Sequence, residues 1–247
     1  MGRPEHSNSE REKARVADLM TLLPVNMDTV LDIGARDGMI ARLLAERIPD
    51  VTALDLTLPA IDHQRIRCVK GDATKLDFPD ASFDLIFCTE VLEHIPGHLL
   101  TMACSELSRV SRRYLVIGVP YKQDIRVGRT TCRACGKSNP PWGHVNSFDE
   151  GRLQELFPEC RVVQTSFVGT NRARTNSLAA LFMDLAGNPR GTYEQDEPCI
   201  HCGASIEPPT DRSLMQKVFT KLGYHARRIQ QPFVKPTPNW IHLLLEK

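Results

Sequence analysis

The stretch TVLDIGARDG (residues 29–38) combines three features that together indicate the fold. It begins as an apolar run rich in β-branched residues, which favours a buried strand. It then turns through Gly34 and Gly38, and MIARLLAERI (39–48) follows with helical periodicity. A glycine turn lets a ligand approach the backbone closely, and the start of the next helix favours an anionic group. The stretch therefore predicts a strand–turn–helix unit at a ligand site.

The first half of the chain repeats this alternation of strands and helices. An amphipathic helix is expected around residues 9–23 and another helix at 98–110. Further strands are expected at VTALDL (51–56), IRCVKGDA (66–73), FDLIFCTE (83–90) and RYLVIGVP (113–120). Continuous apolar strands separated by helices are typical of a parallel sheet covered on both faces. We therefore expect an α/β fold with an open, mostly parallel, Rossmann-like sheet.

Acidic residues stand at the ends of several predicted strands: Asp32, Asp55, Asp72 and Glu90. Ligands of open α/β sheets bind outside the carboxyl ends of the strands, so these side chains are site candidates. Asp55 follows Gly38 by 17 residues and is well placed to accept hydrogen bonds from ribose hydroxyls. Each feature alone also fits a tight turn or a helix cap. Their occurrence in this order favours a nucleotide-like cofactor.

Three segments, VLDIGARDG, ALDLT and KGDATKLDFPDASFDLIFCTEVLEHI, carry a family resemblance. Over residues 25–120 the chain resembles class I S-adenosylmethionine (SAM)-dependent methyltransferases, in the methyltransferase-11-like group. The resemblance implies that Asp55 binds the ribose, that Asp72 and the Ala73 amide recognise adenine, and that the Gly34–Gly38 loop with Asp32 holds the methionine part. Further residues expected at the cofactor are Ala35, Leu56, Thr89 and Glu90. Arg36 replaces a third glycine of the usual motif.

Methyl transfer depends mainly on positioning, but a hydroxyl acceptor also needs a base within hydrogen-bond reach. The candidate catalytic residues are His94, in LEHIP, and His144, in GHVNSF. His94 also fits a structural or substrate-wall role. His144 also fits a solvated loop or a neighbour of a metal.

The second half of the chain predicts the end of the sheet and two insertions. The predicted divisions are 1–120 (N-terminal helix and SAM-binding half), 121–148 (first insertion), 149–169 (helix and sixth strand), 170–238 (second insertion) and 239–247 (reversed last strand). Ser147 is a plausible cap of the helix at 149–157, and Asp211 of a helix at 211–229.

Each insertion contains a Cys-x-x-Cys pair followed by glycine, in CRACG and CIHCG. The fifth and sixth strands should be parallel, so both insertions leave from the carboxyl edge and the two pairs can meet over the active site. Four thiolates, from Cys132, Cys135, Cys199 and Cys202, would form a closed structural zinc site that staples a lid. Unrelated buried cysteines, a redox dithiol, and His144 or His201 in place of one thiolate are the alternatives. The other four cysteines read as core residues.

Composition bears on the partners of the chain. Its formal net charge is +1, from 31 basic and 30 acidic residues, and aromatic residues make up 6%. This balance does not favour nucleic acid. No signal peptide and no apolar run of about 18 residues are found, so we expect a soluble, cytoplasmic protein without a membrane span.

We expect a small-molecule or sugar/glycan acceptor, methylated on a hydroxyl. The first insertion is locally basic, with Lys122, Arg126, Arg129, Arg133 and Lys137 against Asp124. That cluster keeps an RNA or protein methyltransferase open as an alternative. A SAM-binding protein without catalysis is a further alternative.

Overall fold

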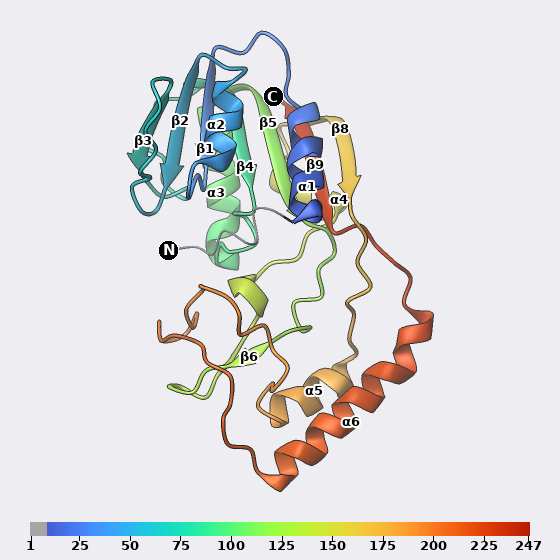
Figure 1. Cartoon of the computed structure of the whole chain (residues 1–247). Coiled ribbons are helices and arrows are strands. Elements are labelled where there is room, and N and C mark those ends of the chain that lie inside the picture. Colours follow the sequence, from blue (N-terminus) through green and yellow to red (C-terminus); the bar gives the residue numbers. More distant parts are fainter. Residues whose placement is uncertain (1–8) are drawn as a thin grey trace. The chain divides into compact units, whose positions relative to one another are not determined.

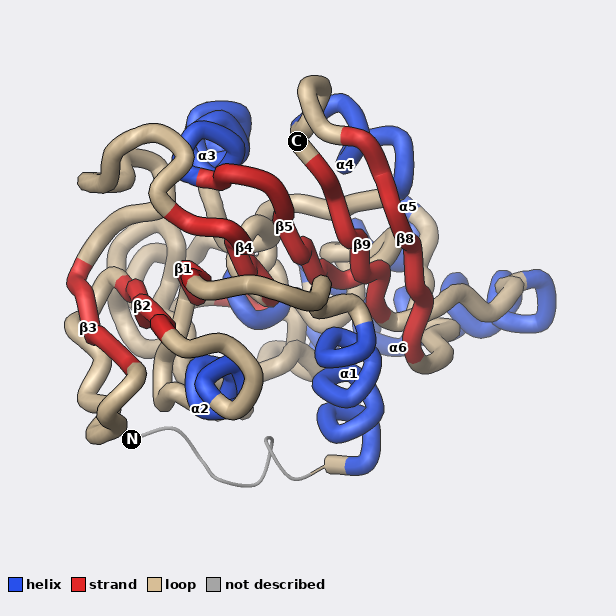
Figure 2. Tube along the Cα trace, turned by 90° about the horizontal axis from the view of Figure 1, so that it is seen from above, coloured by secondary structure: helices blue, strands red, loops and turns tan. Residues whose placement is uncertain are grey.

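Seven strands form one mixed sheet in the order β3-β2-β1-β4-β5-β9-β8 (Figures 1 and 2). The structure is a computed structural model that describes residues 9–247. The chain divides into two units: residues 9–121, 148–169 and 238–247 form the sheet unit, and 122–147 with 170–237 form the insertion unit. The strands of the sheet unit are β1 (Thr29–Ile33), β2 (Asp50–Asp55), β3 (Ile66–Lys70), β4 (Phe83–Thr89), β5 (Ser111–Pro120), β8 (Arg161–Val168) and β9 (Trp240–Glu246). Only β9 runs antiparallel to its neighbours, which confirms the predicted open sheet with a reversed last strand.

The apolar strands are buried on both faces of the sheet. Leu85 and Phe87 of β4 belong to one core cluster, and the alternate residues Ile86 and Cys88 belong to the other. The sheet unit has the helices α1 (Glu10–Thr21), α2 (Met39–Ala45), α3 (Gly97–Val110) and α4 (Glu150–Leu156). Figure 2 shows α1 and α2 on one face and α3 and α4 on the other. Both faces of β4 therefore require apolar residues, which explains its continuous apolar run.

Strands β5 and β8 end at the same edge of the sheet. Pro120, the last residue of β5, lies opposite Trp240 of β9, and Val168, the last residue of β8, lies opposite Trp240 on the other side. Both strands are antiparallel to β9 and are thus parallel to each other, as predicted. The two insertions consequently leave the sheet from its carboxyl edge.

Two predicted helix caps are wrong by two residues. Asp149, not Ser147, caps α4, because its carboxylate accepts a hydrogen bond from the Arg152 N–H at 2.9 Å. Ser213, not Asp211, caps α6 (Leu214–Gln230). Ser213 and Gln216 form a capping box in which each side chain accepts a bond from the other's backbone N–H, an arrangement that starts the helix there.

The insertion unit contains α6 and five smaller elements: the short strands β6 (Thr130–Thr131) and β7 (Ser138–Asn139), the 3₁₀ turns Pro141–Gly143 and Gln231–Phe233, and α5 (Ser177–Leu185). Helix α5 was not predicted. It packs on α6 through stacked rings of Phe182 and Phe219, with centroids 6.1 Å apart. At Gly223 a Cβ atom would lie 3.2 Å from the Ala179 carbonyl oxygen, so glycine permits the close helix contact. Within residues 9–247, no helix has the length and apolar character that a membrane crossing needs.

Candidate functional site

The turn after β1 has the backbone that its glycines require. Gly34 and Gly38 have φ angles of +79° and +80°, a region that favours glycine. A Cβ atom on Gly34 would lie 2.4 Å from Cγ2 of Val91. The N–H groups of Gly34 and Ala35 both donate to the Leu54 carbonyl, at 2.8 and 3.1 Å. The turn is therefore held against the end of β2.

Arg36 adopts the same left-handed backbone, with φ of +45°, at the position where the resembled family has its third glycine. Its N–H donates to Oδ2 of Asp55 at 3.1 Å, and the Thr57 N–H donates to Oδ1 of Asp55 at 3.2 Å. Asp55 thus joins the turn to the end of β2. The neighbouring Leu56 side chain is exposed. The carboxylate is oriented by backbone donors, and its remaining lone pairs can accept bonds from hydroxyl groups of a ligand.

Asp72 follows β3 at the same edge. Its Oδ1 accepts bonds from the backbone N–H and the hydroxyl of Thr74, both at 2.8 Å. Ala73 beside it is buried. A local turn thus orients the Asp72 side chain, and its contact with adenine stays a prediction.

Two acidic side chains at the ends of β1 and β4 are incompletely paired: Asp32 is buried, and Glu90 is partly buried. Burial, and secondly the charge of Asp55, raise the pKa of Asp32 to about 8. Glu90 follows the buried Thr89 with φ of +56°, and burial raises the pKa of Glu90 to about 7. Among residues 9–247, Oδ2 of Asp32 and Oε1 of Glu90 have no hydrogen-bond partner. Buried acids of this kind favour a cationic ligand group, because a nearby positive charge stabilises the carboxylate.

Sequence reasoning missed two further buried charges of the sheet unit. Arg15 of α1 is only 5% exposed and pairs with Glu12 one turn earlier. Glu93 is fully buried, neither carboxylate oxygen has a partner within the described residues, and burial raises its pKa well above the usual range. Arg15 and Glu93 both interact electrostatically with Glu90. The amphipathic helix expected around residues 9–23 gives no sign that Arg15 is buried, and no sequence signal marks the partner of such a charge.

The two candidate histidines have different surroundings. Burial and the charge of Arg36 lower the pKa of His94 to about 4, which makes its imidazole a weak base. His144, in the insertion unit, is buried, and its Nδ1 lies 2.7 Å from Oε1 of Gln123. An amide oxygen only accepts, so Nδ1 carries the proton and Nε2 is the basic nitrogen of the neutral ring. The catalytic role expected of His94 or His144 stays a prediction.

The structure brings the two Cys-x-x-Cys pairs together inside the insertion unit. The four sulfur atoms lie within 4.8 Å of one another, with Cys132 Sγ 3.7 Å from Cys202 Sγ and Cys135 Sγ 3.6 Å from Cys199 Sγ. His201 is not part of this cluster, because its Nε2 bonds the Ser138 carbonyl at 3.1 Å. The predicted meeting of the two pairs is confirmed.

The two pairs also share one backbone geometry. The Gly136 N–H donates to the Cys132 carbonyl at 2.9 Å, and the Gly203 N–H donates to the Cys199 carbonyl at 2.8 Å. Both glycines have φ near +72°. Burial opposes ionisation of Cys199, but the backbone N–H groups of His201 and Cys202 lower the pKa of its thiol to about 6. Amides directed at sulfur favour thiolate, the form that binds a metal. Cys88, Cys104 and Cys160 are buried in the sheet unit, as expected of core residues, and Cys68 is partly buried.

Residues 31–114 match the family model described as a methyltransferase domain. An uncharacterized methyltransferase of Mycobacterium tuberculosis is 34% identical over 84 residues, which cover 31% of this chain and 43% of that protein. A ubiquinone biosynthesis O-methyltransferase of Idiomarina loihiensis is 31% identical over 88 residues, which cover 31% of this chain and 36% of that protein. The chain thus spans less than half the length of these relatives.

Solved structures share the fold over most of the chain at low sequence identity. The 1,6-didemethyltoxoflavin-N1-methyltransferase of Burkholderia thailandensis has a TM-score of 0.56 and 17% identity, and the match covers 100% of this chain and 82% of that one. An S-adenosylmethionine-dependent methyltransferase of Mesorhizobium loti has a TM-score of 0.51 and 15% identity, covering 95% and 98%. The family match, the strand order and the glycine turn agree: residues 31–114 match a methyltransferase domain, within a sheet that has the class I SAM-dependent methyltransferase fold.

Proposed function

We propose that the chain transfers a methyl group from SAM to a small-molecule or sugar acceptor, and that its insertion unit is stapled by zinc. The observation that carries the proposal is the glycine turn held by Asp55 beside the buried, incompletely paired Asp32. Together these residues offer acceptors for ribose hydroxyls and a negative charge for an ammonium group. SAM has both groups, and it supplies a methyl group on a sulfonium that leaves as a neutral thioether.

The residues at the carboxyl edge can each bind a different part of SAM. Asp55 would accept bonds from the ribose hydroxyls, and Asp72 and Ala73 would meet the adenine edge. Asp32 and the Gly34–Gly38 turn would hold the methionine part, with Glu90 beside it. Because Asp32 is buried and Glu90 is partly buried, their attraction to an ammonium group is screened less than it would be in water. These residues position the cofactor, and positioning can account for most of the acceleration of methyl transfer.

The acceptor-side proposal concerns the insertion unit. Its two segments begin where β5 and β8 end, at the carboxyl edge. We infer that this unit supplies acceptor contacts, as the predicted lid would. If the acceptor atom is a hydroxyl oxygen, Nε2 of His144 would take its proton, and the bond from Nδ1 to Gln123 would support the resulting imidazolium.

Zinc fits the four-cysteine cluster on geometry. A Zn–S bond of about 2.3 Å in a tetrahedron separates neighbouring sulfur atoms by about 3.8 Å. The two measured Sγ–Sγ distances, 3.6 and 3.7 Å, agree with this spacing. Four protein ligands leave no open position, so the metal would hold the two insertions together and take no part in the reaction.

The small-molecule acceptor has support from relatives. The names of the similar proteins refer to ubiquinone biosynthesis and to 1,6-didemethyltoxoflavin, both small molecules. An RNA or protein acceptor is the alternative within the enzyme class, and SAM binding without turnover is the alternative outside it.

One labelling experiment separates these possibilities. The protein is incubated with SAM carrying a tritiated methyl group and with a cell extract separated into small molecules, RNA and protein. We expect label in the small-molecule fraction and little label with Asp55→Asn, which keeps the size of the side chain but removes its charge. Label in the RNA or protein fraction would show that the acceptor is RNA or protein and not a small molecule. No label in any fraction, with SAM bound, would support the non-catalytic alternative.

A further inference from the structure

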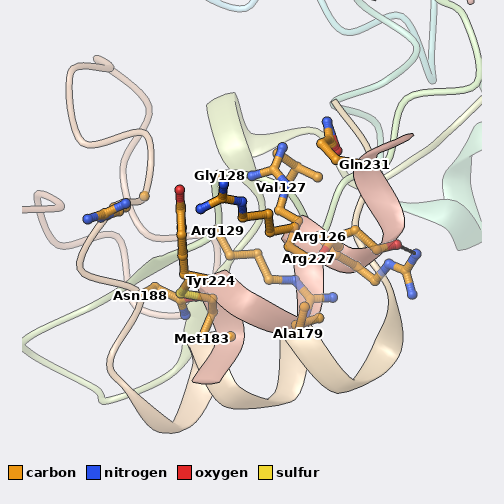
Figure 3. Close-up of a pocket in the computed structure, with 16 residues that line it drawn as sticks. Arg126, Val127, Gly128, Arg129, Ala179, Met183, Asn188, Tyr224, Arg227 and Gln231 are labelled. Atoms are coloured by element: carbon orange, nitrogen blue, oxygen red, sulfur yellow. Dashed lines mark hydrogen bonds between the residues drawn. The ribbon is translucent and has the colours of Figure 1, made fainter. Parts of the chain in front are cut away.

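The insertion unit contains a cavity of about 560 Å³ that the proposed methyl transfer does not use (Figure 3). It lies between helices α5 and α6 and the loop at residues 126–129, and five arginines line it. They come from three parts of the chain: Arg126 and Arg129 from the first insertion, Arg190 from the loop after α5, and Arg227 and Arg228 from the end of α6. The first two belong to the locally basic stretch of the first insertion, and folding adds the other three.

Two of these arginines already have acidic partners. Arg126 forms two bonds with the carboxylate of Asp124, at 2.8 and 3.1 Å, and Arg129 pairs with Asp184 at 3.0 Å. The other three arginines, at 190, 227 and 228, have no carboxylate partner among residues 9–247. The cavity therefore carries an excess of positive charge that its own acidic neighbours leave uncompensated.

Much of the remaining cavity wall is apolar or aromatic, and Thr175, Asn188 and Gln231 add polar side chains. Ala179, Ala180 and Met183 of α5 line it beside Gly223 and Tyr224 of α6. The Arg190 guanidinium lies 5.6 Å from the centre of the Tyr224 ring. At Gly223 the two helices pack closely, since a Cβ atom there would lie 3.2 Å from the Ala179 carbonyl oxygen and from Cγ of Met183. A ligand held here by the arginines would place an uncharged part against alanine, methionine and tyrosine.

We propose that this cavity binds the phosphate or diphosphate group of a small molecule whose uncharged part is a ring. Three guanidinium groups without acidic partners suit a group with several negative oxygens, since each can donate paired, charge-assisted bonds to phosphate. The volume falls within the range of small-molecule sites, about 300–1,000 Å³. The positive charge converges on one cavity and does not form a long stripe, which favours a small molecule over RNA.

The test measures binding directly, without SAM or turnover, so it succeeds or fails independently of the proposed methyl transfer. Pyrophosphate and uridine diphosphate are titrated into the full chain by calorimetry. The double variant Arg190→Gln/Arg228→Gln removes two exposed charges that line the cavity. The matched control, Lys217→Gln/Lys221→Gln, removes two exposed charges from α6 that do not line it.

We expect uridine diphosphate to bind more tightly than pyrophosphate, because only the former offers a ring to the apolar wall. The arginine variant should weaken both by about tenfold to a hundredfold, the usual range for charge-assisted bonds, and the lysine control should not. Vesicles with and without phosphatidic acid form a second arm. Vesicle binding lost only in the arginine variant would identify a lipid as the source of the phosphate. No binding of any probe, equal loss in both variants, or tighter competition by a short single-stranded RNA would overturn the proposal.

Discussion

Binding of SAM should release protons from Asp32, and the variant Asp32→Asn tests this. Burial and the charge of Asp55 raise the pKa of this carboxyl to about 8, so most of it is protonated at pH 7. A positively charged group in contact stabilises the carboxylate and lowers its pKa. The SAM ammonium is expected to be that group. Binding therefore favours the deprotonated form, and SAM affinity should increase as pH rises from 6 toward 8.

The size of the effect follows from the pKa. At pH 7 a carboxyl with a pKa of about 8 is about 90% protonated. An adjacent positive charge lowers a carboxyl pKa by about 1–3 units, so the bound form is between about 50% and 1% protonated at that pH. Asp32 should then release about 0.4–0.9 proton for each SAM bound. Without ligand, the folded state holds this proton more tightly than the unfolded chain does, so the contribution of Asp32 to stability falls as pH rises from about 4 to 8.

Calorimetry at pH 7 in PIPES and in Tris measures this release, because the two buffers differ in ionisation enthalpy. Glu90, whose pKa is about 7, adds its own protons, so the difference between the wild type and Asp32→Asn isolates the contribution of Asp32. The control Glu90→Gln should keep that contribution. Equal proton release by the wild type and Asp32→Asn would refute the placement of the ammonium group beside Asp32.

Three further outcomes are expected. Elemental analysis should find about one zinc per chain, lost in Cys132→Ser and kept in Cys68→Ser; a metal-free wild type purified without chelators would exclude the staple. Gly38→Ala should lower the free energy of unfolding, measured by chemical denaturation, by about 1–2 kcal/mol or more, because φ is +80° and the new Cβ would lie 2.5 Å from Ile61. An unchanged unfolding midpoint would show that the turn tolerates a side chain. Replacing His94 by Asn should leave the pH dependence of turnover unchanged above pH 5, since the pKa of His94 is about 4; a shifted profile would identify it as a base.

Much of the sheet unit could be predicted because its signals are local. Three of these signals lie within a few residues of the feature that they indicate. They are the apolar run at 29–33, the glycines of the following turn and the acidic residue that ends β2. The clustering of the four cysteines was also predictable, because the parallel strands β5 and β8 bring both insertions to one edge of the sheet. In each case a short-range pattern and a topological rule were sufficient.

The remaining features depend on contacts between distant residues. Arg15 occupies an ordinary position of an amphipathic helix, and its burial follows from tertiary packing. The cap of α6 is an exception, because Ser213 and Gln216 form a local capping box, a short pattern that the choice of Asp211 overlooked. The cavity combines arginines up to 102 positions apart, Arg126 and Arg228, and no spacing within either segment indicates that they converge.

Equilibrium binding of S-adenosylhomocysteine tests the central claim most directly. The wild type is compared with Asp55→Asn and with the exposed control Asp77→Asn. One ligand should bind per chain. Affinity should fall by about tenfold to a hundredfold in Asp55→Asn, the usual range for charge-assisted bonds, and should not change in the control. No binding by the wild type, or equal affinity in all three proteins, would contradict a SAM site at this edge of the sheet.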